Sequence, residues 1–155
     1  MPDHHDFLQQ ALRLAEENVA RGGQPFGALI VRDGEVLATG VNGTAHNQDP
    51  TSHSEIEAIR SACRTLGTSR LDGAIVYASG YPCAMCMSAI HIAGISAVYY
   101  AYGEDDGARY GLATEPVYHA LRQLPDSAAI ALHRPDVRLP AEHLYARWRA
   151  AAEKP

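Results

Sequence analysis

The chain has 155 residues, a length typical of one domain, and 46% of them are hydrophobic, which excludes a disordered chain. The formal net charge of −5 at pH 7 disfavours a nucleic-acid partner, and no apolar stretch is long enough to span a membrane. Three cysteines do not make a disulfide framework, and the polar first residues do not resemble a signal peptide, so we expect a cytoplasmic protein.

The spacing of apolar residues predicts helices that alternate with strands. In chain order we expect a helix over 3–21, strands over 26–31 and 36–38, a helix over 54–66, a strand over 74–78, a helix over 83–93, a strand over 97–102, a helix over 116–124, a strand over 128–133 and a helix over 141–151. Asp33-Gly34 signals a hairpin between the first two strands, while 40–50 is expected to be a polar loop and 105–115 has no clear pattern. The alternation predicts an α/β fold with a largely parallel sheet led by one antiparallel hairpin.

Two short segments carry the residues that point to chemistry. They are His53-Ser54-Glu55 and, about thirty residues later, Pro82-Cys83-Ala84-Met85-Cys86, each at the start of a predicted helix. A helix N-terminus stabilises thiolates, which are the forms of cysteine that bind metal. Three ligands, His53, Cys83 and Cys86, leave one coordination position open, as in catalytic zinc sites.

Glu55 is predicted to move protons rather than to bind the metal. The order H-x-E followed by P-C-x-x-C is the signature of zinc-dependent nucleobase deaminases. In that chemistry zinc-bound hydroxide attacks a ring carbon, and the free glutamate carries protons to a ring nitrogen and to the departing amine. We therefore expect one Zn²⁺ per chain and the hydrolytic release of ammonia from a small aminated heterocycle.

Other interpretations of the cysteines stay open. Cys83 and Cys86 alone would also suit a redox pair of the thioredoxin type, although His53 and Glu55 would then have no role. A structural zinc site would need a fourth protein ligand. The remaining cysteine, Cys63, lies on the apolar stripe of its predicted helix and is expected to pack in the core instead.

Over most of its length the sequence resembles the cytidine deaminase-like superfamily, and within its purine branch the bacterial guanine deaminases. The resemblance rests on matching segments in the family's order, Pro25-Phe26-Gly27-Ala28, Asn42, Asp49 to Glu55, Pro82 to Cys86 and Leu144 to Trp148. It implies a three-layer α/β/α sandwich around a mixed, mostly parallel five-stranded sheet. It also implies one domain over 1–155, a C-terminal tail over about 140–155 that closes the pocket, and a homodimer in which this tail can be swapped.

The resemblance further implies residues that bind the base. Asn42 would hydrogen-bond it, Phe26 would wall the ring, and the backbone beside Ser54 would position it, while Tyr145 in the tail would close the pocket. Each role has a structural alternative. Phe26 could pack in the strand, Asn42 could serve the turn before Gly43, and Tyr145 could belong to the packed face of a helix.

Two departures from the guanine deaminase pattern concern the substrate. The chain reads Gly111-Leu112-Ala113-Thr114 where those enzymes have Gly-Phe-Asp-Asp, so Thr114, with Glu115 beside it, stands at the position of the acidic residue that binds guanine. Tyr81 replaces a glutamate that many relatives have before the Pro-Cys pair. A hydroxyl does not replace a carboxylate as acceptor or base, so these positions decide which ring edge is favoured.

The sequence predicts a hydrolase that acts on the C–N bond of a cyclic amidine, with guanine, converted to xanthine and ammonia, as the first candidate substrate. One alternative is a pyrimidine deaminase of the cytosine type. Another is a tRNA adenosine deaminase, which shares Pro25, Asn42 and the metal motif. The acidic charge and the aromatic C-terminal tail count against that alternative, because an RNA-bound base needs a basic surface and an open pocket.

Overall fold

The computed structural model describes residues 3–124 and 130–154. The chain divides into two compact units, Met1–Arg122 and Gln123–Pro155, and the first unit contains the sheet. Among the described residues, no helix combines the length and the apolar character needed to cross a membrane.

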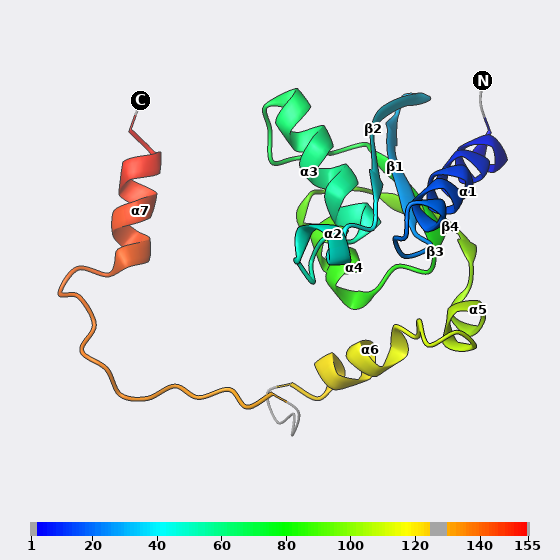
Figure 1. Ribbon diagram of the computed structural model, residues 1–155. Helices are drawn as coiled ribbons and strands as arrows, with labels where there is room; N and C mark the ends of the chain where they lie inside the picture. The colour runs from blue at the N-terminus through cyan, green and yellow to red at the C-terminus, as the bar shows by residue number, and fades with distance from the viewer. Residues whose placement is uncertain (1–2, 125–129, 155) are drawn as a thin grey trace. The chain divides into compact units, whose positions relative to one another are not determined.

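The helices and strands follow the predicted order closely. In chain order they are α1 (His4–Ala20), β1 (Gly27–Arg32), β2 (Glu35–Val41), α2 (Thr44–Asn47), α3 (Ser54–Leu66), β3 (Ile75–Gly80), α4 (Ala84–Ile92), β4 (Ala97–Tyr102), α5 (Glu104–Ala108), α6 (Glu115–Arg122) and α7 (Leu144–Ala152) (Figure 1). The expected hairpin is present: Asp33 and Gly34 have φ values of 54° and 79°, as a type I′ turn requires. Two short helices were not predicted, α2 in the polar loop and α5 in the segment without a clear pattern.

The sheet is mixed, as predicted, with the strand order β2-β1-β3-β4. The expectation that it is mostly parallel is wrong for the described residues, because β1 is antiparallel to both β2 and β3 and only β3 and β4 pair in parallel. The reason lies in the hairpin. The α3 crossover does make β2 and β3 run in the same direction, but β1 lies between them and opposes both.

The predicted fifth strand, Ala128 to His133, lies partly outside the described residues, which resume at residue 130. Its described part, 130–133, forms no strand, so the sheet of the described residues has four strands rather than five. Ile130 and Leu132 are 69% and 62% exposed. An alternating apolar pattern becomes a strand only when a neighbouring strand pairs with it, and the pattern alone could not supply that partner.

The three layers that the resemblance implied are present in the first unit (Figure 1). On one face of the sheet, Phe7 and Ala11 of α1 pack against Leu29, Val31 and Tyr77. On the other face, side chains of α3 and α4 pack against the alternate residues of the same strands; this second cluster includes Ala28, Ile30, Ala58, Ala62, Val76, Ala78 and Ile90. The alternation along β1 thus fixes which face carries α3 and α4.

A close approach of β2 to α3 sets the position of the start of α3. A Cβ atom at Gly40 would overlap the carbonyl oxygen of Ser54 and would lie 2.5 Å from the amide nitrogen of Ala58. Only a residue without a side chain lets the strand pass this near to the helix backbone. The first turn of α3, which carries the H-x-E motif, is therefore held directly against the sheet.

Candidate active site

The two halves of the motif meet because each stands at the beginning of a helix. His53 is the N-cap residue of α3 and Cys83 is the N-cap residue of α4, both with extended backbone. Cys83 Sγ accepts a hydrogen bond from the backbone N–H of Cys86 at 3.5 Å, so the thiol serves as the cap of its own helix. Pro82 precedes this cap and lacks the N–H that the chain would otherwise have to satisfy here.

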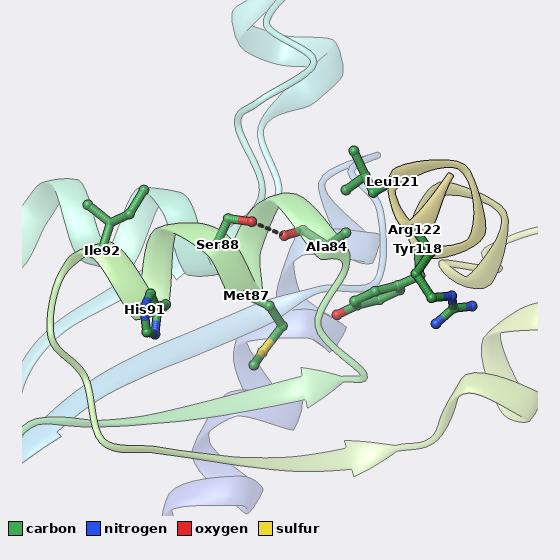
Figure 2. Close-up of a pocket in the computed structure, with 8 residues that line it drawn as sticks. All are labelled: Ala84, Met87, Ser88, His91, Ile92, Tyr118, Leu121 and Arg122. Carbon is green, nitrogen blue, oxygen red and sulfur yellow. Dashed lines mark hydrogen bonds between the residues drawn. The ribbon is translucent and has the colours of Figure 1, made fainter. Parts of the chain in front are cut away.

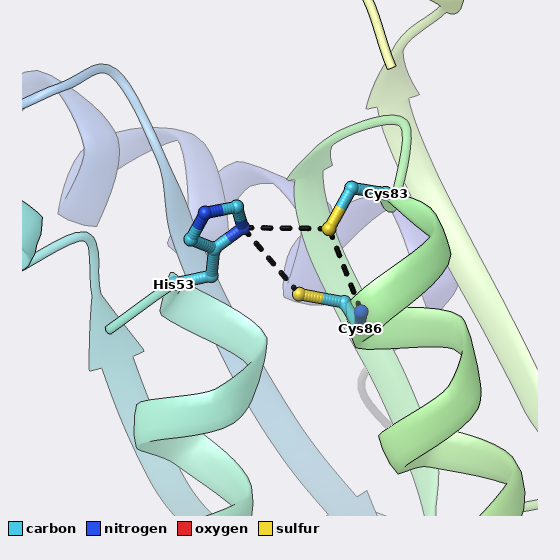
Figure 3. A group of neighbouring side chains, drawn as sticks. All are labelled: His53, Cys83 and Cys86. Carbon is cyan, nitrogen blue, oxygen red and sulfur yellow. Dashed lines mark hydrogen bonds between the residues drawn. The ribbon is translucent and has the colours of Figure 1, made fainter. Parts of the chain in front are cut away.

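Figure 3 shows His53, Cys83 and Cys86 directed toward one another from α3 and α4. His53 Nδ1 lies 3.4 Å from Cys83 Sγ and 3.7 Å from Cys86 Sγ. In a tetrahedral zinc site, Zn–S bonds of about 2.3 Å and Zn–N bonds of about 2.0 Å place sulfur and nitrogen about 3.5 Å apart. The spacing of these three side chains therefore fits Zn²⁺, with Nδ1 as the imidazole donor.

The group that could hold an ion contains three ligands. Among the described residues, the group at the motif consists of His53, Cys83 and Cys86, whose ligand atoms all lie within 4.8 Å of one another, and it includes neither Glu55 nor Cys63; a second group, Asp3, His5 and Asp6, is exposed at the start of the chain. Cys63 is half-buried and packs against the core cluster, as predicted. Three protein donors match a catalytic site with an open position better than a closed structural site.

Hydrogen bonding gives the thiols of Cys83 and Cys86 different pKa values. The Cys86 thiol and the His53 ring lower the pKa of Cys83 to about 4. The neighbouring Cys83 sulfur and burial raise the pKa of Cys86. The pKa of His53 is raised, first by its hydrogen bond to Cys83. These contacts favour the thiolate form of Cys83, which is the form that binds a metal.

Glu55 lies in the first turn of α3 and is only 6% exposed. Its Oε2 accepts hydrogen bonds from Ser54 Oγ at 3.0 Å and from the Cys86 thiol at 3.5 Å. Burial raises the pKa of this carboxyl group above its ordinary value. A carboxylate that is buried beside the three donors, but outside their group, is placed to exchange protons there.

A backbone hydrogen bond joins Asn42 and Phe26, the two residues expected to contact the base. Asn42 is buried, and its backbone N–H donates to the carbonyl of Phe26 at 3.1 Å. The Asn42 Oδ1 atom accepts from the backbone N–H of Thr44 at 3.2 Å and from its hydroxyl at 3.0 Å. Because the Thr44 N–H can only donate, the amide orientation of Asn42 is fixed, with its oxygen toward Thr44 and its nitrogen away. The half-buried Phe26 ring lies against Gly80, at the end of β3 before the cysteine motif.

Ser54 is buried, and its hydroxyl is used within the protein, where it orients Glu55. Thr114 is half-buried, and its hydroxyl donates to Glu104 Oε2 at 2.5 Å. The other carboxylate oxygen of Glu104 accepts from the backbone N–H groups of Thr114 and Glu115, at 2.7 and 3.1 Å. An acidic side chain therefore lies against Thr114 even though position 114 itself carries none.

Two further aromatic residues have different surroundings. Tyr145 belongs to α7 in the second unit and is 79% exposed, with its ring near that of His143. Tyr81 precedes the cysteine motif and makes edge contacts with the rings of Tyr100 and Tyr118. The departure from glutamate at position 81 thus creates an aromatic cluster beside the motif.

The sequence reasoning missed a set of contacts that shape the loop before His53. Asp49 accepts from the backbone N–H and the hydroxyl of Thr51, at 2.8 and 2.7 Å. Arg60 forms ion pairs with Asp49 and Glu57, and Glu57 also accepts from Ser52 Oγ at 3.0 Å. The Asp-Pro-Thr order was a readable signal, because aspartate commonly bonds the N–H two residues on and so builds a turn.

Tyr118 of α6 was also missed, since no local pattern reveals its partner. Its hydroxyl donates to the carbonyl of Pro82 at 2.7 Å, next to Cys83, and burial raises its pKa to about 12, so the donor persists at neutral pH. A mostly apolar groove of about 500 Å³ lies between α6 and the side of α4 that carries Met87 and His91 (Figure 2). His53, Glu55, Cys83 and Cys86 do not line this groove.

Comparison with known proteins gives consistent matches. A family model described as "Cytidine and deoxycytidylate deaminase zinc-binding region" matches residues 1–102. The chain is 39% identical to guanine deaminase of Bacillus subtilis (strain 168) over 155 residues, which covers 98% of this chain and 97% of that protein. It is 40% identical to a tRNA-specific adenosine deaminase of Agrobacterium fabrum over 107 residues, 69% of this chain and 70% of the relative.

Solved structures agree with the sequence comparisons. The X-ray structure of guanine deaminase from Bacillus subtilis superposes with a TM-score of 0.89 at 39% identity, and the match covers 99% of this chain and 98% of that one. A structure of guanine deaminase from Nitrosomonas europaea gives a TM-score of 0.70 at 27% identity over 75% of this chain and 68% of the other.

Proposed function

The chain belongs to the cytidine and deoxycytidylate deaminase family, and from this we propose that it is a zinc-dependent hydrolase that converts guanine and water to xanthine and ammonia. The observation that carries the proposal is the convergence of His53, Cys83 and Cys86 beside the buried carboxylate of Glu55. Guanine is proposed because the match to guanine deaminase runs over nearly the whole of both chains.

We assign His53 Nδ1, Cys83 Sγ and Cys86 Sγ as the zinc ligands. When bound, zinc supplies a Lewis acid that makes water a nucleophile near neutral pH. Two thiolates balance the charge of the ion and the imidazole binds as the neutral base, which leaves the site close to electroneutral. The short distances from His53 Nδ1 to both sulfurs support this assignment.

Glu55 is assigned as the proton carrier. Its carboxylate takes a proton from the attacking water and delivers it to a ring nitrogen of the base. The remaining proton of the added hydroxyl group then passes through Glu55 to the amino group, which leaves as ammonia while the carbonyl of the product forms. Burial raises the pKa of Glu55 above its ordinary value, so this carboxyl group holds a proton more readily than an exposed one. The hydrogen bond from Ser54 keeps the carboxylate oriented.

Asn42 and Phe26 are assigned to the base. The Asn42 oxygen is used by Thr44, so the group this side chain offers to a ligand is an N–H of its amide nitrogen, which selects a hydrogen-bond acceptor such as a ring nitrogen or carbonyl of the purine. Phe26 supplies an apolar wall for the ring. Thr114 can contact the base through its oxygen lone pairs, because its hydroxyl hydrogen is taken by Glu104.

We further propose a homodimer in which the C-terminal segment from about residue 140 closes the pocket, either in its own subunit or by a swap into the partner. Tyr145 and Trp148 support this, because they are 79% and 71% exposed, and burial against another protein surface stabilises large aromatic side chains. A cytoplasmic location suits two cysteines that must stay reduced to bind metal.

A tRNA adenosine deaminase is the second candidate, favoured by the 40% identity to the Agrobacterium fabrum protein. That match covers 69% of this chain, whereas the guanine deaminase match covers 98%. The net charge of −5 also provides little attraction to a polyanion.

The test is ammonia release by the zinc-loaded protein with guanine, adenine, cytosine and isocytosine as separate substrates, and with tRNA read out as inosine. We expect turnover of guanine, with xanthine identified by chromatography. Inosine in tRNA without turnover of any free base would replace the proposal by the second candidate, and turnover of cytosine alone would move the substrate to pyrimidines.

A further inference from the structure

Asn18 is a buried polar residue near the end of α1 that the reaction itself does not require. It is 6% exposed, although most polar residues of this helix face solvent. Its side-chain nitrogen donates to two backbone carbonyls, that of Gln24 at 2.8 Å and that of Asn42 at 2.9 Å. Both hydrogens of the amide are therefore used, and both go to the segments that carry the proposed base-binding residues.

These bonds close a small network around Phe26 and Asn42. The Gln24 carbonyl also accepts from the Phe26 N–H at 2.8 Å, and the Phe26 carbonyl accepts from the Asn42 N–H at 3.1 Å. The Gln24 side-chain oxygen lies 3.4 Å from Asn42 Nδ2. Asn18 is thus the side chain that holds the strand entry before Phe26 and the strand exit at Asn42 in register.

The chain makes room for this side chain at Gly23. A Cβ atom at Gly23 would overlap the amide group of Asn18. The Gly23 N–H donates to the Asn18 carbonyl at 2.8 Å, so the helix end is folded back around the side chain. A bulkier residue at position 23 would displace the amide from its two acceptors.

We propose that Asn18 is a positioning residue for substrate binding, which acts through Asn42 and Phe26 without touching the base. The inference rests on the proposed function, because it takes Asn42 and Phe26 as the residues that contact the base. Without the Asn18 donors, the Asn42 carbonyl loses its partner in a buried place and the segment has to move to find another. His53, Cys83 and Cys86, at the starts of α3 and α4, bond to one another and not to Asn18.

The experiment compares Asn18→Ala and Asn18→Ser with the wild-type zinc enzyme. For Asn18→Ala we expect KM for guanine to rise roughly tenfold, with a smaller change in kcat and zinc content unchanged, because Asn42 and Phe26 are no longer held in the arrangement that binds the base. Asn18→Ser keeps one hydrogen-bond donor, so its KM for guanine is expected to lie between that of the wild type and that of Asn18→Ala. A fall in kcat with unchanged KM would overturn the positioning role.

A matched control separates positioning from general loss of stability. Leu71→Ala removes a fully buried side chain from the core cluster on the α3 and α4 face, so it destabilises the fold without touching the Asn18 network. At a temperature where both variants are folded, we expect Leu71→Ala to keep the wild-type KM. An equal rise of KM in both variants would overturn the proposal.

A second readout does not depend on the substrate. Hydrogen exchange of the Asn42 backbone N–H and the NMR signals of its side-chain amide report the position of Asn42 directly. We expect faster exchange and shifted signals in Asn18→Ala, and unchanged signals would overturn the inference whatever the substrate is. If the wild type fails to deaminate guanine, the proposed function fails, while the Asn42 signals still decide whether Asn18 positions this segment.

Discussion

His53 and Glu55 stand two residues apart at the start of α3 and reach different neighbours. The imidazole of His53 faces the two cysteine sulfurs, whereas the Glu55 carboxylate is buried beside Ser54 and Cys86. Spacing within a helix start fixes such directions, so these residues could be predicted from the sequence as one site. Asn18 could not, because its two acceptors lie in other segments and a helical pattern assigns it to the polar face.

We predict that zinc binding depends on the two cysteines of the site and not on Cys63, the third cysteine of the chain. Cys83→Ser should reduce zinc to near zero per chain, because a neutral hydroxyl replaces a thiolate ligand. Cys63→Ser serves as the matched control and should retain zinc, since Cys63 packs against the core cluster. Metal analysis after gel filtration measures both, and full zinc in Cys83→Ser would remove this residue from the ligand set.

At the scale of elements, sequence patterns predicted helix and strand positions better than strand pairing. The ends of α3 and α4, the helices whose starts carry the motif, were predicted to within a few residues. The antiparallel pairing of β1 with β3 was not, because a βαβ pattern does not reveal that the hairpin strand β1 inserts between β2 and β3. Pairing depends on long-range packing, which periodicity does not encode.

The close approach of β2 to α3 leads to a prediction about Gly40. Gly40→Ala should lower the free energy of unfolding by about 1–3 kcal/mol or more, because the new methyl group meets the helix backbone, which cannot yield as a side chain could. The same shift displaces the start of α3, so zinc affinity should fall as well. Urea unfolding and zinc titration measure the two effects.

Gly103 provides the control for this substitution. A Cβ atom there would lie 3.7 Å from the nearest side-chain atom, an ordinary contact, and the residue has a φ of −78°. Gly103→Ala should therefore lower the free energy of unfolding by about 1 kcal/mol at most, the cost of alanine at the N-cap of α5. Equal stability of the two variants would show that β2 does not press against α3.

At the scale of the whole molecule, the chain consists of two compact units, and the proposed metal ligands belong to the first. The three-layer arrangement of that unit was expected from the family resemblance, and apolar clusters on both faces of the sheet confirm it. The role of the second unit was inferred from resemblance and stays a prediction, since no pattern within 123–155 specifies where those residues bind.

Removal of the segment after Leu144 tests that role. We expect the shortened protein to keep its zinc and to lose most of its turnover of guanine through a higher KM, because in the proposed arrangement the tail supplies Tyr145 to the pocket. Kinetics and metal analysis of the shortened chain provide the comparison. Unchanged KM and kcat would show that the tail takes no part in closing the site.

The central claim is that Glu55 carries the protons at a zinc site formed by His53, Cys83 and Cys86. The most direct measurement is the rate of xanthine formation from guanine by Glu55→Gln, with zinc content determined on the same sample and Glu16→Gln, an exposed glutamate on α1, as the matched control. We predict one zinc per chain in both variants, wild-type turnover in Glu16→Gln, and a fall of kcat by roughly 10³-fold or more in Glu55→Gln, since an amide cannot carry the proton. Wild-type turnover in zinc-loaded Glu55→Gln would contradict the account.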